Sequence, residues 1–512
     1  MKRLSVAVRA HSISLLLALL AFIIHAFTNW LSLYGYFRDE LYYIACTEHL
    51  DWGYVDQPPL SILLLWLNRA LLGDSLFALR LPTAVASAAL VYLTGLFVTE
   101  LGGGKKAQLL VCLCVLVSPI YLTLGDFYSM NAFEPLFWVG AALVIVRILK
   151  TDNQKLWLLF GAIAGLGLEN KHSMAFLGVA IILGLMLTPH RRQFLSKWIW
   201  LGGAVAGIIA LPNIIWQITH NWPTLEFLRR AQELKNYPMS LPEFFGMQVL
   251  FHHPAAAPLW IAGLGVLFFQ KTLKPYRLFG YAYMILFLFF LFQRGKPYYL
   301  SPIYPVFLAA GALAFEEYVA RKGRAWIFTT YTSLIVVSGV ALLPMFLPLL
   351  PPQEYSRIAA KIGINEVKTE RQEDTQLPQV LADRFGWREL ARDVAQVFKS
   401  LNPEDQSRVA IYTQNYGEAG AIDFFGGQYG LPKAISGHNS YWLWGTHGFS
   451  GDIAIVVGGR RQDHERAFES VELISVHKAD FAMPYENNLP IYLCRKLKAP
   501  LGNIWPSTKH YI

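Results

Sequence analysis

The chain has 512 residues, of which 54% are hydrophobic and 15% charged, and its formal net charge is +9. A soluble domain carries about 25% charged residues, so this composition excludes an ordinary soluble protein. The positive charge does not indicate nucleic-acid binding either. Most of the basic residues lie in short segments between long apolar runs, where such residues orient membrane spans.

Apolar runs of span length recur through the first two thirds of the sequence, and about 20 apolar residues cross the ~30 Å hydrocarbon core of a bilayer. We therefore predict a mainly α-helical, multi-pass membrane protein with about eleven transmembrane helices. The spans are expected near residues 12–33, 75–100, 107–124, 131–149, 155–168, 173–188, 198–218, 254–270, 277–293, 299–317 and 325–346.

The distribution of basic residues predicts the orientation of these spans. With the N-terminus inside, the inner segments carry 17 Lys and Arg residues, beginning with Lys2, Arg3 and Arg9. The outer segments before residue 347 carry nine. This bias follows the positive-inside rule, and an odd number of spans then places the C-terminal part outside, in the periplasm if the host is Gram-negative.

The composition divides the chain into two predicted domains. Residues 1–349 form a transmembrane domain whose first outer loop covers residues 34–74. Charge rises after the proline-rich "LPLLPPQEY", and residues 350–512 hold strand-like "RVAIYTQ" and "GDIAIVVGG", with helix-like "GEAGAIDFFGGQ" after the first. This pattern predicts a small α/β domain on the outer face.

The first outer loop contains two predicted helices, within "RDELYYIACTEHL" and "PPLSILLLWLNRALLG". Apolar residues recur at helical spacing in both, and prolines before the second helix with Gly73 after it suit a helix start and stop. Both helices look too short or too one-sided to span a membrane. We expect them to lie in the membrane interface with their apolar sides down.

Asp39 and Glu40 stand at the end of the first predicted span, in "YFRDELYYIA". A carboxylate at that position is partly desolvated, which is costly unless it has a partner or a function. A carboxylate at a membrane surface can act as general base toward a hydroxyl group. These two residues are therefore candidates for catalysis.

The segment "YFRDELYYIA…DWGYVDQPPL" resembles the first outer loop of the GT-C glycosyltransferases. It is most similar to the branch that contains the protein O-mannosyltransferases and the lipid A aminoarabinose transferase. The resemblance implies a GT-C fold and an inverting transfer of sugar from a polyprenyl-phosphate donor, without nucleotide sugar, on the outer side of the membrane. It also implies that Asp39 is the catalytic base, with Glu40 as its neighbour.

Later segments extend the resemblance over roughly residues 30–345. "GDFYSMNAFEPLFW" is similar to the family's second acidic motif, which implies Asp126 and Glu134 as its acidic residues. "GLGLENKHSM" and "RGKPYYLSPIYPVF" resemble segments that carry the family's basic residues. Arg and Lys on the outer face can stabilise a leaving phosphate. Lys171, Lys296 and Arg294 are therefore the candidate ligands of the donor phosphate, although each could also be an ordinary residue at a membrane end.

A divalent metal ion is a further candidate cofactor. The aminoarabinose transferases read Glu-Lys-Pro-Pro where this sequence has Asp56-Gln57-Pro58-Pro59, and their Glu helps to bind a metal while their Lys approaches the donor phosphate. Asp56 could be a metal ligand together with His220. Gln57 cannot supply the positive charge.

The sequence thus predicts a glycosyltransferase whose partners are a polyprenyl-phosphate sugar donor and a glycolipid, polysaccharide or protein acceptor. One alternative is a transporter of lipids or lipid-linked sugars, but transporters place charges near the membrane midplane, often in paired repeats. A second is an inactive receptor that reads a glycolipid. "SGHNSYWLWG" is either an aromatic platform for an acceptor sugar or part of a packed core.

Overall fold

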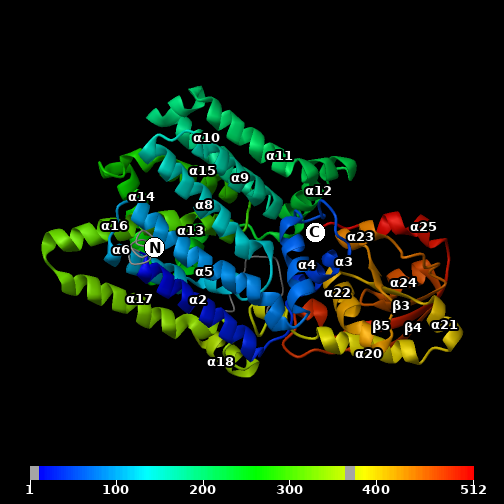
Figure 1. The fold of residues 1–512 in the computed structure, drawn as a ribbon. Coiled ribbons are helices and arrows are strands. Elements are labelled where there is room, and N and C mark those ends of the chain that lie inside the picture. The colour runs from blue at the N-terminus through cyan, green and yellow to red at the C-terminus, as the bar shows by residue number, and fades with distance from the viewer. Residues whose placement is uncertain (1–10, 364–374) are drawn as a thin grey trace.

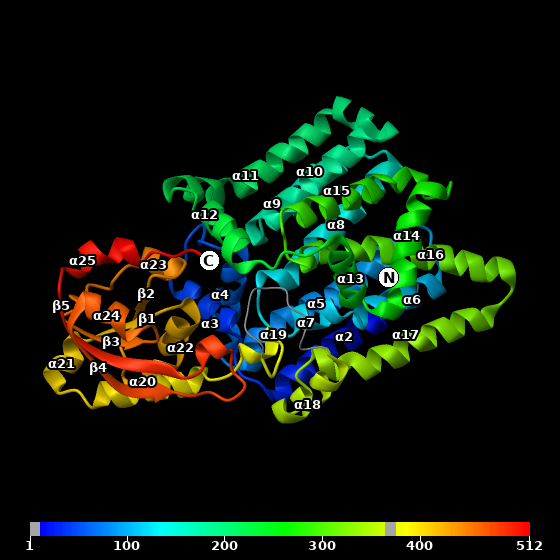
Figure 2. The same cartoon turned by 180° about the vertical axis from the view of Figure 1, so that it is seen from behind.

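The computed structural model describes residues 11–363 and 375–512. Lys2, Arg3 and Arg9, and residues 364–374 of the predicted outer domain, lie outside the described residues. The helices of the first two thirds of the chain form one part of the molecule, and a sheet with its helices forms the other (Figure 1). Helices α3 (Arg38–Glu48) and α4 (Leu60–Leu72) lie where the two parts meet, as the view from behind also shows (Figure 2).

Seven helical segments among the described residues are long and apolar enough to cross a membrane. They are α2 (Ser12–Leu31), α5 (Leu76–Glu100), α8 (Met130–Thr151), α11 (Lys197–Thr219), Lys274–Phe292 with α15 (Leu278–Phe292), Pro297–Lys322 with α16 (Tyr304–Lys322), and α17 (Ala325–Phe346). The prediction of a mainly helical, multi-pass membrane protein is therefore confirmed.

Three bent helix pairs pass the same test when each pair is taken together, which gives up to ten spans in the described residues. They are α6 (Lys105–Leu116) with α7 (Pro119–Gly125), α10 (Ser173–Met186) with η1 (Pro189–Leu195), and α13 (Leu241–Phe251) with Pro254–Phe269, which contains α14 (Ala257–Phe269). The bends between the paired helices are 61°, 111° and 98°.

The one expected span that remains is the fifth in chain order, which corresponds to α9 (Leu156–Asn170). Its 15 residues rise only about 22 Å, which is shorter than the hydrocarbon core. It packs tightly against α11 at two glycines. A Cβ on Gly161 would lie 2.1 Å from the carbonyl oxygen of Gly202, and a Cβ on Gly202 would lie 2.3 Å from that of Trp157. Small residues allow this close approach of helices within membranes. The short helix is thus held against a full-length neighbour.

The C-terminal part carries a five-stranded sheet with the strand order β2-β1-β3-β5-β4. Strands β1 (Ala410–Thr413), β2 (Ala434–Ser436) and β3 (Ile453–Val457) are parallel, and Ile411 of β1 faces Ile455 of β3. Strands β4 (Phe468–His477) and β5 (Leu489–Leu497) add two antiparallel pairings. The predicted strands and the predicted helix, α22 (Tyr416–Phe425), are all present.

Helix α3 belongs to the core of this C-terminal part and does not lie flat in the membrane interface as predicted. Eight of its residues are buried, and Leu41 and Ile44 share a hydrophobic cluster with Ile411 and Ile455 of the sheet. The physical reason is that "LYYIAC" is apolar around the whole helix, and such a helix is buried on all sides. Helix α4 differs because Leu63, Leu67 and Leu71 are exposed, which gives it the outward apolar face of an interfacial helix.

Further short elements connect these helices and strands. Helix α12 (Pro223–Arg230) and the π-helical turn η2 (Ala231–Lys235) connect α11 to α13. The other elements used below are η5 (Pro297–Ile303), α18 (Pro352–Ile362), α19 (Gln379–Ala382), α20 (Trp387–Lys399), α23 (Ser440–Trp444) and η8 (Pro484–Glu486).

Candidate active site

Asp39 lies in the first turn of α3, at the contact between the helical part and the sheet part. Its Oδ1 accepts a hydrogen bond of 2.8 Å from the Tyr416 hydroxyl, which belongs to α22. Arg38 Nε lies 4.0 Å from the same oxygen. The described residues offer no hydrogen bond to Oδ2, and 34% of the side chain is exposed. Asp39 therefore has one anchored oxygen and one oxygen that can receive a proton.

Glu40 is the neighbour of Asp39 in sequence, but its environment is very different. Its side chain is 0% exposed, and Arg80 Nε and Nη2 donate to its two oxygens at 2.7 and 2.8 Å. The main-chain N–H groups of Tyr128 and Phe37 donate to the same carboxylate at 2.7 and 2.8 Å. Four donors occupy both oxygens, so we infer that Glu40 fixes the start of α3 and does not act as a base.

Asp56 lies in the segment between α3 and α4, near Asp39. Its Oδ1 accepts a hydrogen bond of 2.9 Å from the hydroxyl of Tyr42, whose oxygen also lies 2.7 Å from Ser440 Oγ of α23. Burial, and to a smaller extent the charge of Asp39, raise the pKa of Asp56 to about 6, against the hydrogen bond from Tyr42. The two carboxyl groups therefore share one electrostatic environment.

The segment that contains Asp126 and Met130 contacts the C-terminal part through Arg384 and helix α3 through Tyr43. Asp126 Oδ2 accepts a hydrogen bond of 2.7 Å from Arg384 in a buried ion pair, and its Oδ1 accepts one of 3.3 Å from Thr28. The N–H of Met130 donates to the hydroxyl of Tyr43, one turn of α3 after Asp39, at 3.2 Å. The structure thus uses Asp126 to hold the C-terminal part in place.

Glu134 and Lys171, predicted as separate site residues, form a buried ion pair. Lys171 Nζ lies 2.7 Å from Glu134 Oε2 and 2.8 Å from Asn131 Oδ1. The same ammonium group lies 4.9 Å from the ring centre of Tyr299 and 5.6 Å from that of Tyr298. Because Asn131 directly follows Met130, a continuous series of contacts joins α3 to Lys171.

Lys296 also lies near Tyr298, with its Nζ 6.0 Å from the ring centre. Lys171 and Lys296 therefore share one tyrosine, and their role in binding phosphate stays a prediction. Arg294 has an exposed side chain, and its carbonyl oxygen accepts a hydrogen bond of 2.9 Å from Asn236. Arg294 anchors the end of the loop between α12 and α13, and its role in binding phosphate stays a prediction.

The candidate metal ligands Asp56 and His220 have other contacts. Asp56 accepts a hydrogen bond from the hydroxyl of Tyr42. The ring of His220 stacks on that of Trp216 with centres 4.2 Å apart, and its Nδ1 lies 2.9 Å from the Trp216 carbonyl oxygen. Within residues 11–363 and 375–512, no three His, Cys, Asp or Glu side chains form a group that could hold a metal. The described side chains around Asp56 and His220 therefore do not fit a metal ion.

Three residues near the acidic site were not selected from the sequence. Tyr42 and Tyr416 stack with ring centres 4.7 Å apart and donate to Asp56 and Asp39. Lys235, at the end of η2, lies close enough for its charge to oppose the burial-driven rise in the pKa of Asp56. A sequence signal existed only for Lys235, as a basic residue in an outer loop.

The aromatic segment "SGHNSYWLWG" packs against the first outer loop. Trp444 stacks on His49 with ring centres 4.3 Å apart, and its ring centre lies 4.6 Å from that of Tyr441. Tyr441 is buried and donates to Asp423 at 2.8 Å. These contacts favour the packed-core interpretation over a free platform for a sugar.

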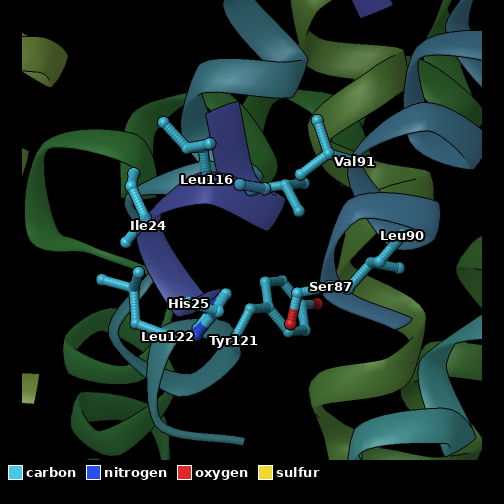
Figure 3. Close-up of a pocket in the computed structure, with 10 residues that line it drawn as sticks. Ile24, His25, Ser87, Leu90, Val91, Leu116, Tyr121 and Leu122 are labelled. Atoms are coloured by element: carbon cyan, nitrogen blue, oxygen red, sulfur yellow. The ribbon is translucent and has the colours of Figure 1, made fainter. Parts of the chain in front are cut away.

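A small internal cavity of about 10 Å³ lies away from this site, among α2, α5, α6 and α7 (Figure 3). Its lining includes His25, Ser87 and Tyr121, and otherwise mainly aliphatic side chains. This volume admits about one water molecule. The cavity is too small for a sugar, and Asp39 does not line it.

Comparison with known proteins agrees with this fold. Residues 56–216 match the family described as dolichyl-phosphate-mannose-protein mannosyltransferase. The chain is also similar to the lipid A galacturonosyltransferase RgtD of Rhizobium johnstonii, with 26% identity over 40% of this chain and 42% of the relative. It is 24% identical to the undecaprenyl phosphate-alpha-4-amino-4-deoxy-L-arabinose arabinosyl transferase 1 of Pseudomonas fluorescens, over 53% of this chain and 50% of that protein. The chain thus spans about half the length of these relatives.

Among solved structures, the chain resembles ArnT from Cupriavidus metallidurans in the apo state. The TM-score is 0.60 at 13% identity, and the alignment covers 94% of this chain and 97% of ArnT. The protein is therefore a multi-pass membrane protein with the GT-C fold. Its sequence matches are to the mannosyltransferase family model, the lipid A galacturonosyltransferase and the arabinosyl transferase named above.

Proposed function

We propose that the protein is an inverting glycosyltransferase that moves a sugar from a polyprenyl-phosphate donor to a hydroxyl acceptor on the outer side of the membrane. The observation that carries this proposal is the geometry of Asp39, with one oxygen anchored by Tyr416 and the other without a hydrogen bond among the described residues. The GT-C fold and the names of the relatives support the same reaction class. One relative is named for an undecaprenyl-phosphate sugar and another for lipid A.

In the proposed reaction, Asp39 Oδ2 takes the proton of the acceptor hydroxyl while that oxygen attacks the anomeric carbon of the sugar. The bond between the anomeric carbon and the phosphate oxygen breaks, and the electron pair leaves with the polyprenyl phosphate. Attack from the side opposite the phosphate inverts the anomeric centre. A positioned general base contributes about 10²–10⁴-fold in rate.

The leaving phosphate needs positive charge. Lys171 and Lys296 both lie within about 6 Å of the Tyr298 ring centre, and Lys235 lies near Asp56. Glu134 pairs with Lys171 at 2.7 Å, and Lys296 and Lys235 are the other lysines that we propose as ligands of the phosphate. These two lysines replace the charge that Gln57 cannot supply, since Gln57 is buried and its side-chain amide lies 3.7 Å from Cys46 Sγ.

The transporter alternative fits the site less well. Transporters bind substrates near the bilayer midplane between discontinuous helices. Here Asp39 lies in the first turn of α3, and Asp56 and Lys296 lie in loops between helices. An acceptor hydroxyl could reach this region from water or from the membrane surface.

The proposed function predicts a change in the outer glycans of the host cell. Mass spectrometry of the envelope lipids, polysaccharides and proteins, compared with and without this protein, should reveal one glycoform that is lost on deletion. Expression of the wild-type chain should restore it, and expression of the Asp39→Asn chain should not. Identical glycans with and without the protein would contradict the proposal.

The proposed orientation predicts that the sheet part faces outward. Alkaline phosphatase fused after Ile512 should be active, because this enzyme folds only outside the cytoplasm, and a cytoplasmic reporter at the same position should be inactive. The motive is the excess of basic residues in the predicted inner segments. The opposite pair of results would place the site inside and contradict the proposed orientation.

A further inference from the structure

Helix α22 of the sheet part approaches α3 very closely because of two glycines on one face. A Cβ on Gly420 would lie 2.9 Å from the Leu41 carbonyl carbon and 3.0 Å from its oxygen. A Cβ on Gly417 would lie 2.4 Å from Arg38 Cγ. Real Cβ atoms essentially never come this close to other heavy atoms, so a side chain at either position would require its neighbour to shift. The absence of side chains at these positions therefore sets the distance between the two helices.

This close approach brings Tyr416, the first residue of α22, to Asp39. The Tyr416 hydroxyl donates to Asp39 Oδ1 at 2.8 Å, and its ring stacks on Tyr42 with centres 4.7 Å apart. Its N–H donates to His438 Nδ1 at 3.3 Å, and His438 Nε2 lies 2.9 Å from the main-chain oxygen of Ile512. The tyrosine is thus held through its hydroxyl, its ring and its backbone.

The protonation states of Tyr416 and His438 keep the Tyr416 hydroxyl as a hydrogen-bond donor to Asp39. Burial raises the pKa of Tyr416 well above 10, so its hydroxyl keeps its proton and can only donate to a carboxylate. Burial lowers the pKa of His438 well below 6.5, so its ring is neutral and its Nδ1 can accept the N–H of Tyr416. The hydrogen bond to Asp39 therefore keeps one direction at physiological pH.

Asp39 has little else to orient it. Arg38 Nε lies 4.0 Å away, and the guanidinium of Arg38 is directed mainly to Tyr485 at 2.8 Å and Asp383 at 3.6 Å. A partly exposed carboxylate can rotate between side-chain conformers. The hydrogen bond from Tyr416 selects the conformer in which Oδ1 is bound and Oδ2 receives no hydrogen bond from the described residues.

We propose that Tyr416 is a positioning residue for the base Asp39, and that the sheet-bearing C-terminal part therefore completes the active site. This inference rests on the proposed function. The sheet explains how the residue is supplied, because Tyr416 follows the carboxyl end of β1 while His438 and Ser440 follow that of β2. In open α/β sheets, functional side chains gather at the carboxyl ends of parallel strands.

The test measures sugar transfer by the purified full chain from two donors to lipid A. The donors are undecaprenyl phosphate carrying 4-amino-4-deoxy-L-arabinose and undecaprenyl phosphate carrying galacturonic acid. Tyr416→Phe keeps the ring that stacks on Tyr42 and removes only the hydroxyl. Because misplacement of a reacting group by about 1 Å can cost about a hundredfold in rate, we expect kcat to fall about ten- to a hundredfold. The KM for the donor should stay within about twofold, since the change does not touch the donor-binding lysines.

A second substitution distinguishes positioning from a general structural role. In an Asp39→Asn background, Tyr416→Phe should cause no further loss of kcat, because Tyr416 acts through Asp39 and effects of coupled residues are not additive. Gly420→Ala, which separates α22 from α3, should lower kcat in the same way. Tyr492→Phe, on β5 and remote from Asp39, serves as the matched control and should leave kcat and KM unchanged.

Two results would overturn the inference. One is a kcat of Tyr416→Phe within about twofold of wild type while Asp39→Asn is inactive, which would leave the proposed function standing. The other is a loss of kcat that multiplies with that of Asp39→Asn, which would show that Tyr416 acts independently of the base. A wild-type chain that uses neither donor, together with outer glycans that stay unchanged on its deletion, would remove both the proposed function and this inference.

Discussion

Asp39→Asn should reduce turnover at least about a hundredfold while the protein still inserts, folds and binds donor lipid. Asparagine has the size of aspartate, and its side-chain oxygen can still accept the hydrogen bond from Tyr416. It cannot accept the acceptor's proton. Loss of a general base costs about 10²–10⁴-fold, which is at least about 3 kcal/mol of activation free energy. Steady-state kinetics at equal protein concentration would measure this effect.

The matched control for this substitution is Asp74→Asn. Asp74 lies in the same outer loop, and its carboxylate pairs with Arg69 at 2.6 Å with half of the side chain exposed. Exposed ion pairs contribute about 0–1 kcal/mol, so turnover and thermal stability should stay near wild type. Normal turnover of Asp39→Asn would remove the assignment of the base.

Glu40→Gln should lower the free energy of unfolding by about 3–5 kcal/mol, because removal of one member of a buried ion pair leaves an uncompensated charge. Here the stranded charge is Arg80, whose side chain is 1% exposed and which donates twice to Glu40. The N–H groups of Phe37 and Tyr128 lose the same acceptor. The start of α3 would loosen, and Asp39 with it. Chemical unfolding in detergent would measure the change.

Glu404→Gln is the control for this effect. Glu404 pairs with Arg408 one helical turn away at 3.6 Å, and 82% of its side chain is exposed, so its loss should change stability by less than about 1 kcal/mol. A Glu40→Gln protein as stable as this control would contradict the role given to Glu40. A large loss of activity in Glu40→Gln without a loss of stability would instead show that Glu40 takes part in the reaction.

The sequence predicted the parts of the fold that depend on local pattern. Apolar runs of span length coincide with the helices, and the alternation of strand-like and helix-like segments around Ile411 and Ile455 coincides with β1, α22 and β3. Strands β2, β4 and β5 were not predicted. Strand β2 has only three residues, too few for a recognisable pattern. Strands β4 and β5 pair with each other at the edge of the sheet, and such pairing depends on tertiary context more than on local pattern.

The candidate site was predictable only in part, because its partners are distant in sequence. Asp39 could be selected from the sequence because its carboxylate stands at the end of a predicted span. Its hydrogen-bond donor Tyr416 could not, because it lies 377 positions later. The partner of Asp126 is Arg384, 258 positions away. The burial of α3 between two parts of the chain also follows from tertiary packing. Its residue pattern shows an apolar helix without showing what covers it.

The account as a whole depends on the lipid-linked donor, so transfer by the purified protein is its most direct test. The wild-type chain in detergent would be given the acceptor identified by the envelope glycan comparison, with either undecaprenyl phosphate carrying a radiolabelled sugar, or the matching nucleotide sugar and no carrier lipid. We predict labelled acceptor and an equal amount of released undecaprenyl phosphate in the first reaction, and no label transfer in the second. Transfer from the nucleotide sugar alone, without any carrier lipid, would contradict it.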